Sequence, residues 1–294
     1  MIDTVELMKK VGDIRVLTAR LVDDRLSGDY HSVFRGQGME FDEVRAYVPG
    51  DDVRSIDWNV TARVGYPHIK RYSEERELTI LFMVDVSGSQ GYGSRGRSKM
   101  ELAAEVTALL ALTAIRNQDK IGLILFSDRI VKYIPPRKGR DSVMRLVREV
   151  LASEDEAQGG TDIEGALRFL NGVQKRKAVV FLVSDFLIDK NYEKLLRATA
   201  RRHDLVCVPV SDPAESELPD VGLVELEDPE SGELVLVDTS SKAVRGAFAA
   251  KAETEREDLR TFFLKTGIDT MNVQTDRPYI NEVRGLFKRR ARKR

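Results

Sequence analysis

The stretch from residue 78 to residue 210 alternates short apolar runs with amphipathic segments, and this alternation restricts the fold more than any other feature. The pattern predicts strands over 78–86, 120–126, 130–134, 178–183 and 205–210, with helices over 99–116, 141–152, 162–172 and 192–202. Strands that alternate with helices form a mainly parallel sheet covered by helices on both faces. We therefore expect a doubly wound α/β domain here, with a hairpin turn at 127–129.

The segments on either side of this region have different patterns. Apolar residues at helical spacing predict an N-terminal helix over 3–26 with Gly28 as its stop signal, whereas residues 30–78 predict a small β-rich extension of short strands and turns. After residue 210 we expect a hairpin over 223–237, a helix over 242–265, a strand over 268–273 and a final short helix. The expected parts are 1–77, 78–287 with C-terminal elaborations, and a basic tail at 288–294.

Composition limits the classes of function. The 294 residues carry a net charge of −1, so no global field favours nucleic acid, although six basic side chains lie in the tail. Cys207, the one cysteine, lies in an apolar run, which predicts an inert buried thiol. No stretch approaches the ~18 apolar residues of a membrane span. We expect a cytoplasmic protein without a membrane span.

Oxygen-bearing side chains follow two predicted strands and precede one predicted helix. Asp85, Ser87 and Ser89 come after the first strand, Thr161 comes before the helix at 162, and Asp185 follows the strand at 178. In open α/β sheets, ligands gather at the carboxyl ends of the strands. Carboxylate and hydroxyl oxygens suit a hard cation such as Mg²⁺. The five residues therefore predict a site for Mg²⁺ or Mn²⁺.

Each of these residues also has a purely structural interpretation. Thr161 and Glu164 match a capping box for the helix at 162, which would assign the threonine to the helix end. Asp185 fits a turn, and Asp85 fits the polar end of a strand. The joint placement of all five at one edge of the sheet favours the metal site.

The order Asp-x-Ser-x-Ser, Thr, Asp resembles the metal-ion-dependent adhesion site of von Willebrand factor A-like domains. Upstream, the segments at 34–41 and 50–58, with Ala62 and Arg63, resemble the family catalogued as domain of unknown function 58. The resemblance covers about residues 30–210. Many members have N-terminal membrane helices, which this chain lacks, so membrane attachment is not carried over.

The resemblance implies a function in protein binding. Ser87, Ser89 and Thr161 would supply hydroxyl ligands, Asp85 and Asp185 would act partly through water, and a partner's Asp or Glu would complete the site. It also implies a MoxR-type AAA+ ATPase as partner, with the protein as an adaptor in client remodelling or maturation. No small-molecule substrate is expected.

Support for catalysis is weaker. The stretch 91–98 resembles a phosphate-binding loop, but Arg97 stands where the lysine is needed. None of the histidines, His31, His68 and His203, is predicted at the metal end of the sheet, as a Ser-His-Asp hydrolase would require. We predict that the protein is not an enzyme.

Two alternatives stay open. In a metal-dependent hydrolase or phosphatase, a neighbouring carboxylate would act as base, and the candidates are Glu154, Asp155, Glu156 and Asp162. In a weak nucleic-acid binder, the basic tail would contact phosphates.

The Arg- and Asp-rich segment 34–63 also has two interpretations. It fits a salt-bridged structural cap or a partner-binding face, and Trp58 is predicted to anchor its packing.

Overall fold

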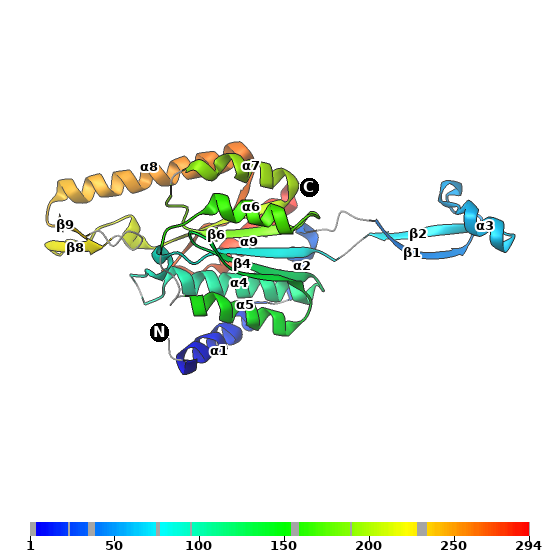
Figure 1. The fold of residues 1–294 in the computed structure, drawn as a ribbon, viewed down its shortest axis with the longest axis horizontal. Coiled ribbons are helices and arrows are strands. Elements are labelled where there is room, and N and C mark those ends of the chain that lie inside the picture. The colour runs from blue at the N-terminus through cyan, green and yellow to red at the C-terminus, as the bar shows by residue number, and fades with distance from the viewer. Residues whose placement is uncertain are drawn as a thin grey trace. The chain divides into compact units, whose positions relative to one another are not determined.

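The computed structural model describes residues 4–22, 24–34, 39–74, 77–94, 96–153, 159–188, 190–227 and 234–293 (Figure 1). The contacts divide the chain into two units. One unit contains the residues up to Val33 and those from Thr79 onwards, and the other contains Phe34–Leu78. The N-terminal helices belong to the larger unit because they pack on its helices, whereas the predicted division grouped them with the extension in 1–77.

A mainly parallel sheet forms the centre of the larger unit. Its strand order is β10-β7-β6-β3-β4-β5, β11 also pairs with β7, and β5 is the antiparallel strand. The strands are β3 (Thr79–Asp85), β4 (Lys120–Phe126), β5 (Ile130–Arg137), β6 (Val179–Ser184), β7 (Asp204–Ser211), β10 (Asp269–Thr270) and β11 (Val273–Gln274). The predicted α/β class is confirmed, and the turn at 127–129 joins the antiparallel pair β4 and β5.

Helices cover both faces of this sheet (Figure 1). One side carries α1 (Thr4–Leu21), α2 (Asp24–Val33), α4 (Lys99–Arg116), α5 (Arg140–Ala152) and α9 (Ile280–Arg292). The other carries α6 (Ile163–Val173), α7 (Glu193–Arg202) and α8 (Lys242–Thr266), which share an apolar core with the strands. Short helical turns η2 (Gly88–Gly91), η4 (Lys190–Tyr192) and η5 (Pro213–Glu215) lie in the connecting loops.

The start of α4 matches the sequence prediction. The Ser98 hydroxyl accepts the N–H of Glu101, and the Glu101 carboxylate accepts the N–H of Ser98, which completes the expected capping box. The interior of this helix is almost entirely buried between the sheet and α1 and α5. This packing fixes the position of α4 and therefore the position of its first residue, Lys99.

The predicted helix over 3–26 is wrong as a single element. Arg116 donates to the carbonyl oxygen of Val22 at 2.7 Å, so a side chain from α4 satisfies a carbonyl at the end of α1. The chain then begins α2, and Gly28 lies inside that helix and not at a stop. A contact distant in sequence, which periodicity does not reveal, explains the error.

The extension is a two-stranded antiparallel hairpin of β1 (Met39–Ala46) and β2 (His68–Glu74), with η1 (Val53–Ser55) and α3 (Trp58–Val64) between the strands. The helix was not predicted. Asp57 caps it by accepting the N–H groups of Asn59 and Val60. Trp58 is 69% exposed, so its prediction as a packing anchor is wrong. Arg45–Asp51 and Lys70–Asp57 ion pairs agree with the salt-bridged interpretation.

The C-terminal region also differs in detail from the prediction. The expected strand over 268–273 is split into β10 and β11, and the predicted hairpin consists of β8 (Leu223–Glu227) and β9 (Leu234–Asp238). The intervening residues 228–233 lie outside the described residues. Most of the basic tail is the last part of α9, and its residues Lys288, Arg289, Arg292 and Lys293 are exposed to solvent. There Arg290 is buried between Asp204 and Asp269.

Candidate functional site

The loop that follows β3 begins with a buried carboxylate at the carboxyl end of the sheet. One oxygen of Asp85 accepts the N–H of Ser87 at 3.0 Å, and the other accepts the hydroxyl of Ser184 at 2.6 Å. Ser184 is the last residue of β6, which pairs with β3. Parallel pairing therefore brings the ends of two strands together around Asp85.

The same loop reaches Asp185, which follows β6. The hydroxyl of Ser89 donates to Oδ2 of Asp185 at 2.8 Å, and the Ser87 and Ser89 hydroxyl oxygens lie 3.3 Å apart. Four of the five predicted residues thus form a chain of hydrogen bonds in which each is bonded to the next, in the order Asp85, Ser87, Ser89 and Asp185. Their juxtaposition at the carboxyl end of the sheet agrees with the prediction for these four.

Thr161, the fifth predicted residue, lies half-buried in a segment that contacts the same loops. The Gly159 carbonyl accepts from the N–H of Gly88 at 3.4 Å, and the N–H of Asp162 donates to the carbonyl oxygen of Ser127 at 2.8 Å. The side chain that caps α6 is Asp162, which accepts from the N–H of Gly165. The capping-box interpretation of Thr161 is therefore wrong.

Lys99 is the site residue that sequence reasoning missed. Its Nζ donates to Oδ2 of Asp185 at 2.7 Å and also to Glu215 of η5, and its side chain is 1% exposed. A positive charge at the first position of a helix opposes the helix dipole. Burial with two carboxylates explains why a lysine is held there. In the sequence, the position of Lys99 directly after the predicted helix cap Ser98 was a signal that could have identified it.

A second layer of hydrogen bonds holds Glu215 in place. The other Glu215 oxygen accepts the N–H of Asp212 at 2.9 Å, and Asp212 accepts the hydroxyls of Ser94 at 2.5 Å and Thr275 at 2.6 Å. These bonds connect the loop after η2, the loop after β7 and the segment after β11. The position of Lys99 therefore depends on three segments that are far apart in sequence.

The electrostatics of the site are unbalanced. Burial, followed by the charge of Asp185, raises the pKa of Asp85 to about 7. Burial lowers the pKa of Lys99, but the charges of Asp185 and Glu215 more than offset this and raise it, so the ammonium stays charged. The Lys99 ammonium thus contacts two carboxylates, Asp185 and Glu215, and the charge of Asp185 also acts on the third carboxylate, Asp85. A further positive charge would stabilise the ionised form of Asp85.

This donor set fits Mg²⁺ or Mn²⁺ in chemical type, since it consists of carboxylate and hydroxyl oxygens. In the described ranges, which omit residues 154–158 among others, no group of three or more His, Cys, Asp or Glu side chains could hold a metal. A cation here would depend on the Ser and Thr hydroxyls as well as on Asp85 and Asp185. Lys99 competes for the same Asp185 oxygen that Ser89 contacts.

Other residues considered in the sequence lie away from this site or have structural contacts. His203 lies just before β7, at the opposite end of the sheet, and His68 begins β2 in the extension. The Arg97 guanidinium donates to the carbonyl oxygens of Gln274 and Thr275, which does not suit a phosphate loop. Cys207 is fully buried, and burial raises the pKa of its thiol.

Solved structures similar to this chain include BatB from Bacteroides thetaiotaomicron, at 15% identity. The match covers 73% of this chain and 99% of that chain, with a TM-score of 0.49. The VWA domain of SpRpn10 is also similar, at 10% identity over 70% of this chain and 93% of that chain, with a TM-score of 0.38. In the part of the chain that the structure describes, no helix has the length and apolar character needed to cross a membrane.

The sequence relatives cover more of the chain. Uncharacterized protein Rv1480 of Mycobacterium tuberculosis is 32% identical over 284 residues, which is 96% of this chain and 89% of the relative. Uncharacterized protein MAV169 of Mycobacterium avium is 32% identical over 161 residues, or 54% of this chain and 94% of the relative. The family model described as "Protein of unknown function DUF58" matches residues 43–258. The chain has an α/β fold with a mainly parallel sheet, and it belongs to the DUF58 family.

Proposed function

We propose that the protein is a Mg²⁺-dependent protein-binding module that uses a metal-ion-dependent adhesion site. The observation that carries this proposal is the meeting of Asp85, Ser87, Ser89 and Asp185 at the ligand-binding edge of the sheet. The segment with Thr161 lies beside them. When bound, Mg²⁺ would supply a coordination position for a carboxylate from a partner protein.

The chain's own residues explain why such a site favours binding over chemistry. Ser184 and the Ser87 N–H orient Asp85, while Ser89 and Lys99 hold Asp185. Lys99 is a poor candidate for a general base because its pKa is raised and it stays protonated. The hydrolase alternative needs another base, and of the candidate carboxylates Asp162 caps α6, whereas residues 154–156 lie outside the described residues.

We also propose a MoxR-type AAA+ ATPase as the partner, with the protein acting as an adaptor in client remodelling or maturation. This part rests on the family resemblance. The nucleic-acid alternative has less support than the sequence suggested, because Arg289, Arg290 and Lys293 contact acceptors within the α/β unit.

Titration calorimetry with Mg²⁺ and Mn²⁺ tests the metal site. We expect Asp85→Ala to weaken metal binding by about a hundredfold or more, since a first ligand matters at least as much as an outer-shell partner. Asp162→Ala is the matched control, because it removes a carboxylate from the Thr161 loop that serves only as a helix cap. Equal metal affinity in wild type and Asp85→Ala would refute the site.

A pull-down with the MoxR-type ATPase, with and without EDTA, tests the partner. Capture that requires both Mg²⁺ and Asp85 supports the adaptor function. A metal-dependent phosphatase activity that disappears in Asp85→Ala would instead favour the enzyme alternative.

A further inference from the structure

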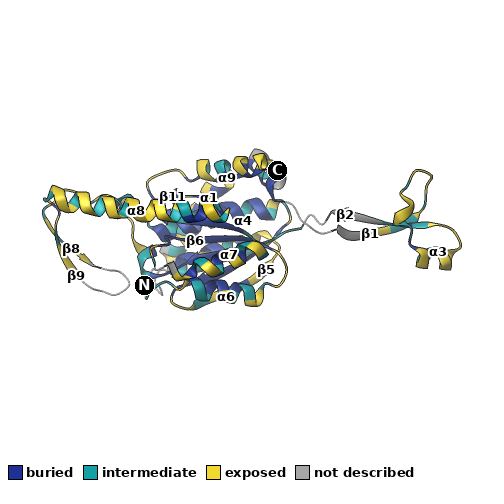
Figure 2. Ribbon diagram, turned by 90° about the horizontal axis from the view of Figure 1, so that it is seen from above, coloured by how far each residue is buried: buried dark blue, intermediate teal, exposed yellow. Residues whose placement is uncertain are grey.

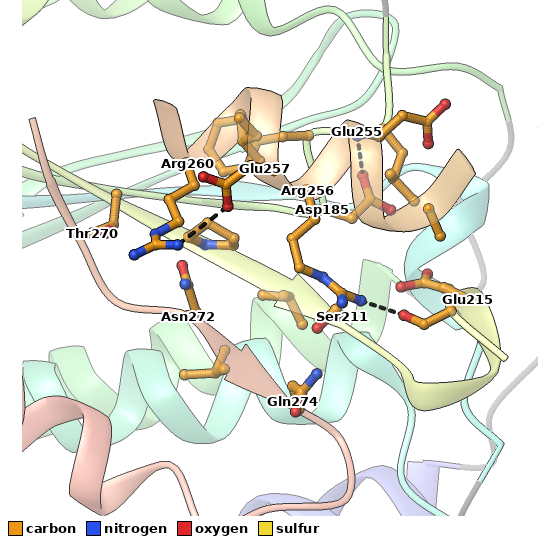
Figure 3. A pocket seen from close by; sticks show the side chains of 18 of the residues that line it. Asp185, Ser211, Glu215, Glu255, Arg256, Glu257, Arg260, Thr270, Asn272 and Gln274 are labelled. Atoms are coloured by element: carbon orange, nitrogen blue, oxygen red, sulfur yellow. Dashed lines mark hydrogen bonds and ion pairs between the residues drawn. The ribbon is translucent and has the colours of Figure 1, made fainter. Parts of the chain in front are cut away.

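A groove of about 1440 Å³ lies between α8 and the edge of the sheet, and Asp185 of the candidate site is among the residues that line it. Figure 3 shows this groove with Arg256 and Arg260 extending from α8 toward the segment that carries Asn272 and Gln274. Pockets for small ligands usually measure about 300–1,000 Å³. The size of this groove favours a segment of protein as its occupant.

One side of the groove is formed by the edge of the sheet. Thr270, Asn272, Val273 and Gln274 line it, whereas Met271 is buried. The hydroxyl and amide groups of Thr270, Asn272 and Gln274 match the N–H and C=O groups of a peptide backbone. Charged side chains, among them Arg277 and Glu282, also line the groove.

The facing wall is an apolar stripe on α8. Phe248, Ala252, Leu259 and Phe263 line the groove at spacings of four, seven and four residues, which places them on one face of the helix, with the charged Glu255 and Arg256 between the two pairs. Within α8, all of which is described, only Phe262 and Phe263 are buried. Figure 2 shows the rest of the helix as largely exposed. Phe263 is buried and Leu259 packs against the core, so the half-buried Phe248 and Ala252 are the part of this face that apolar side chains of an occupant can reach.

The loop of the candidate site contributes a further apolar contact. Phe186, directly after Asp185, has a φ of 59°, a left-handed conformation that is unfavourable for a residue with a side chain. Phe186 is buried against Tyr192 and Phe263, while the next residue, Leu187, lines the groove and is 55% exposed. Backbone strain of this kind collects at functional sites.

Polar contacts tie α8 to neighbouring segments. Arg245 of α8 pairs with Asp220 at 3.1 Å and donates to Ser240 at 3.0 Å, and Arg256 donates to Ser216. These contacts tie the start and the middle of α8 to the segments around the β8–β9 hairpin. A preformed groove binds a peptide with a smaller ordering penalty than a groove that must open.

We propose that this groove binds an extended segment of the partner protein, the segment that carries the carboxylate for the candidate metal site. The inference rests on the proposed function and adds the binding surface for the residues next to that carboxylate. From Phe248 to Phe263, α8 rises by about 22 Å at 1.5 Å per residue. This length fits about six or seven extended residues. Apolar side chains of the segment face α8, and its backbone faces Asn272 and Gln274.

A library of random peptides of this length, each with one fixed Asp, tests the proposal. Peptides are selected on the wild-type protein in Mg²⁺ and eluted at low pH, and their affinities with and without EDTA are then measured by fluorescence polarisation. The variants are Ala252→Arg, which places a long side chain in the groove, and Ala250→Arg. Ala250 is an exposed residue of the same helix that does not line the groove, so it controls for charge and helix propensity. Melting curves of both variants verify folding.

We expect Ala252→Arg to weaken the selected peptides by at least about tenfold, as for a residue central to an interface, and Ala250→Arg to leave them unchanged. Equal binding to wild type and Ala252→Arg would overturn the groove while leaving the metal site intact. Failure to recover any Asp-dependent peptide would also overturn it. Peptides that survive EDTA and Asp85→Ala but are lost in Ala252→Arg would support the groove and refute the metal site.

Discussion

Two buried cations lie at opposite ends of the sheet, each between two acids, and their surroundings differ in charge balance. At the carboxyl end, Lys99 contacts Asp185 and Glu215, with Asp85 nearby. At the amino end, Arg290 contacts Asp204 and Asp269, and Lys293 also contacts Asp269.

The amino-end cluster is electrically complete. Two carboxylates face two cations, and Arg290 forms a bidentate pair with Asp204 at 2.6 and 2.9 Å. At the carboxyl end, one buried ammonium contacts Asp185 and Glu215, and Asp85 is a third carboxylate nearby, whose pKa is raised first by burial and then by the charge of Asp185. A balanced ion cluster serves the fold, whereas an unbalanced one at a ligand-binding edge can take up a cation.

The largest expected effect is from Lys99→Met, which removes the buried ammonium. Without metal, we expect a loss of about 4 kcal/mol in the free energy of unfolding, because Asp185 becomes an unpaired buried charge. Mg²⁺ should restore part of this stability and bind about tenfold more tightly than in wild type, since the competing charge is gone. Urea unfolding with and without Mg²⁺ measures both. If Mg²⁺ stabilises Lys99→Met no more than it stabilises the wild type, the contrast between the two ion clusters is contradicted.

Arg290→Met tests the balanced cluster in the same way. We expect the free energy of unfolding to fall by about 3 kcal/mol, which is less than for Lys99→Met because Asp204 and Asp269 are partly exposed to water. Mg²⁺ should not restore this stability, and Mg²⁺ affinity by calorimetry should equal that of wild type. A specific rescue of Arg290→Met by Mg²⁺ would show that charge imbalance does not distinguish the two clusters.

The smallest expected effect concerns His203, also at the amino end. Burial lowers the pKa of His203 to about 4, and its Nδ1 accepts the N–H of Ala178 at 3.3 Å. A histidine whose folded pKa is lowered takes up its proton first in the unfolded state. Its stabilising contribution is therefore present above pH 6.5 and is lost as the pH falls toward 4. At pH 5 the loss should be about 2 kcal/mol.

The variant His203→Asn keeps a hydrogen-bond acceptor for the N–H of Ala178 and therefore isolates the contribution of His203 protonation to stability. The difference in unfolding free energy between wild type and variant should shrink by about 2 kcal/mol from pH 7 to pH 5. Asp85 titrates with the opposite sign, because its raised pKa makes the metal-free protein less stable as the pH rises from 3.8 toward 7. That contribution is common to both proteins and cancels in the difference. A pH-independent difference would disprove the assignment to His203.

The local signals in the sequence predicted most of the α/β unit. The apolar runs and the Ser98–Glu101 box predicted β3, β4 and α4 almost to the residue, because strand burial and helix capping depend on neighbours in sequence. The errors share a different cause. Arg116 contacts the carbonyl oxygen of Val22 after α1, Arg290 is buried between Asp204 and Asp269, and the exposure of Trp58 depends on how the extension folds.

For the candidate site, the sequence by itself determined which oxygen-bearing side chains gather and the edge of the sheet to which they belong. Asp85, Ser87, Ser89 and Asp185 follow from the rule that parallel strands end together. Only the tertiary structure decided the charge balance at that edge, because Lys99 and Glu215 reach it from a helix and a loop that sequence spacing does not relate to Asp185. Electrostatic energies depend on distance and burial, and both are fixed by packing between segments far apart in the chain.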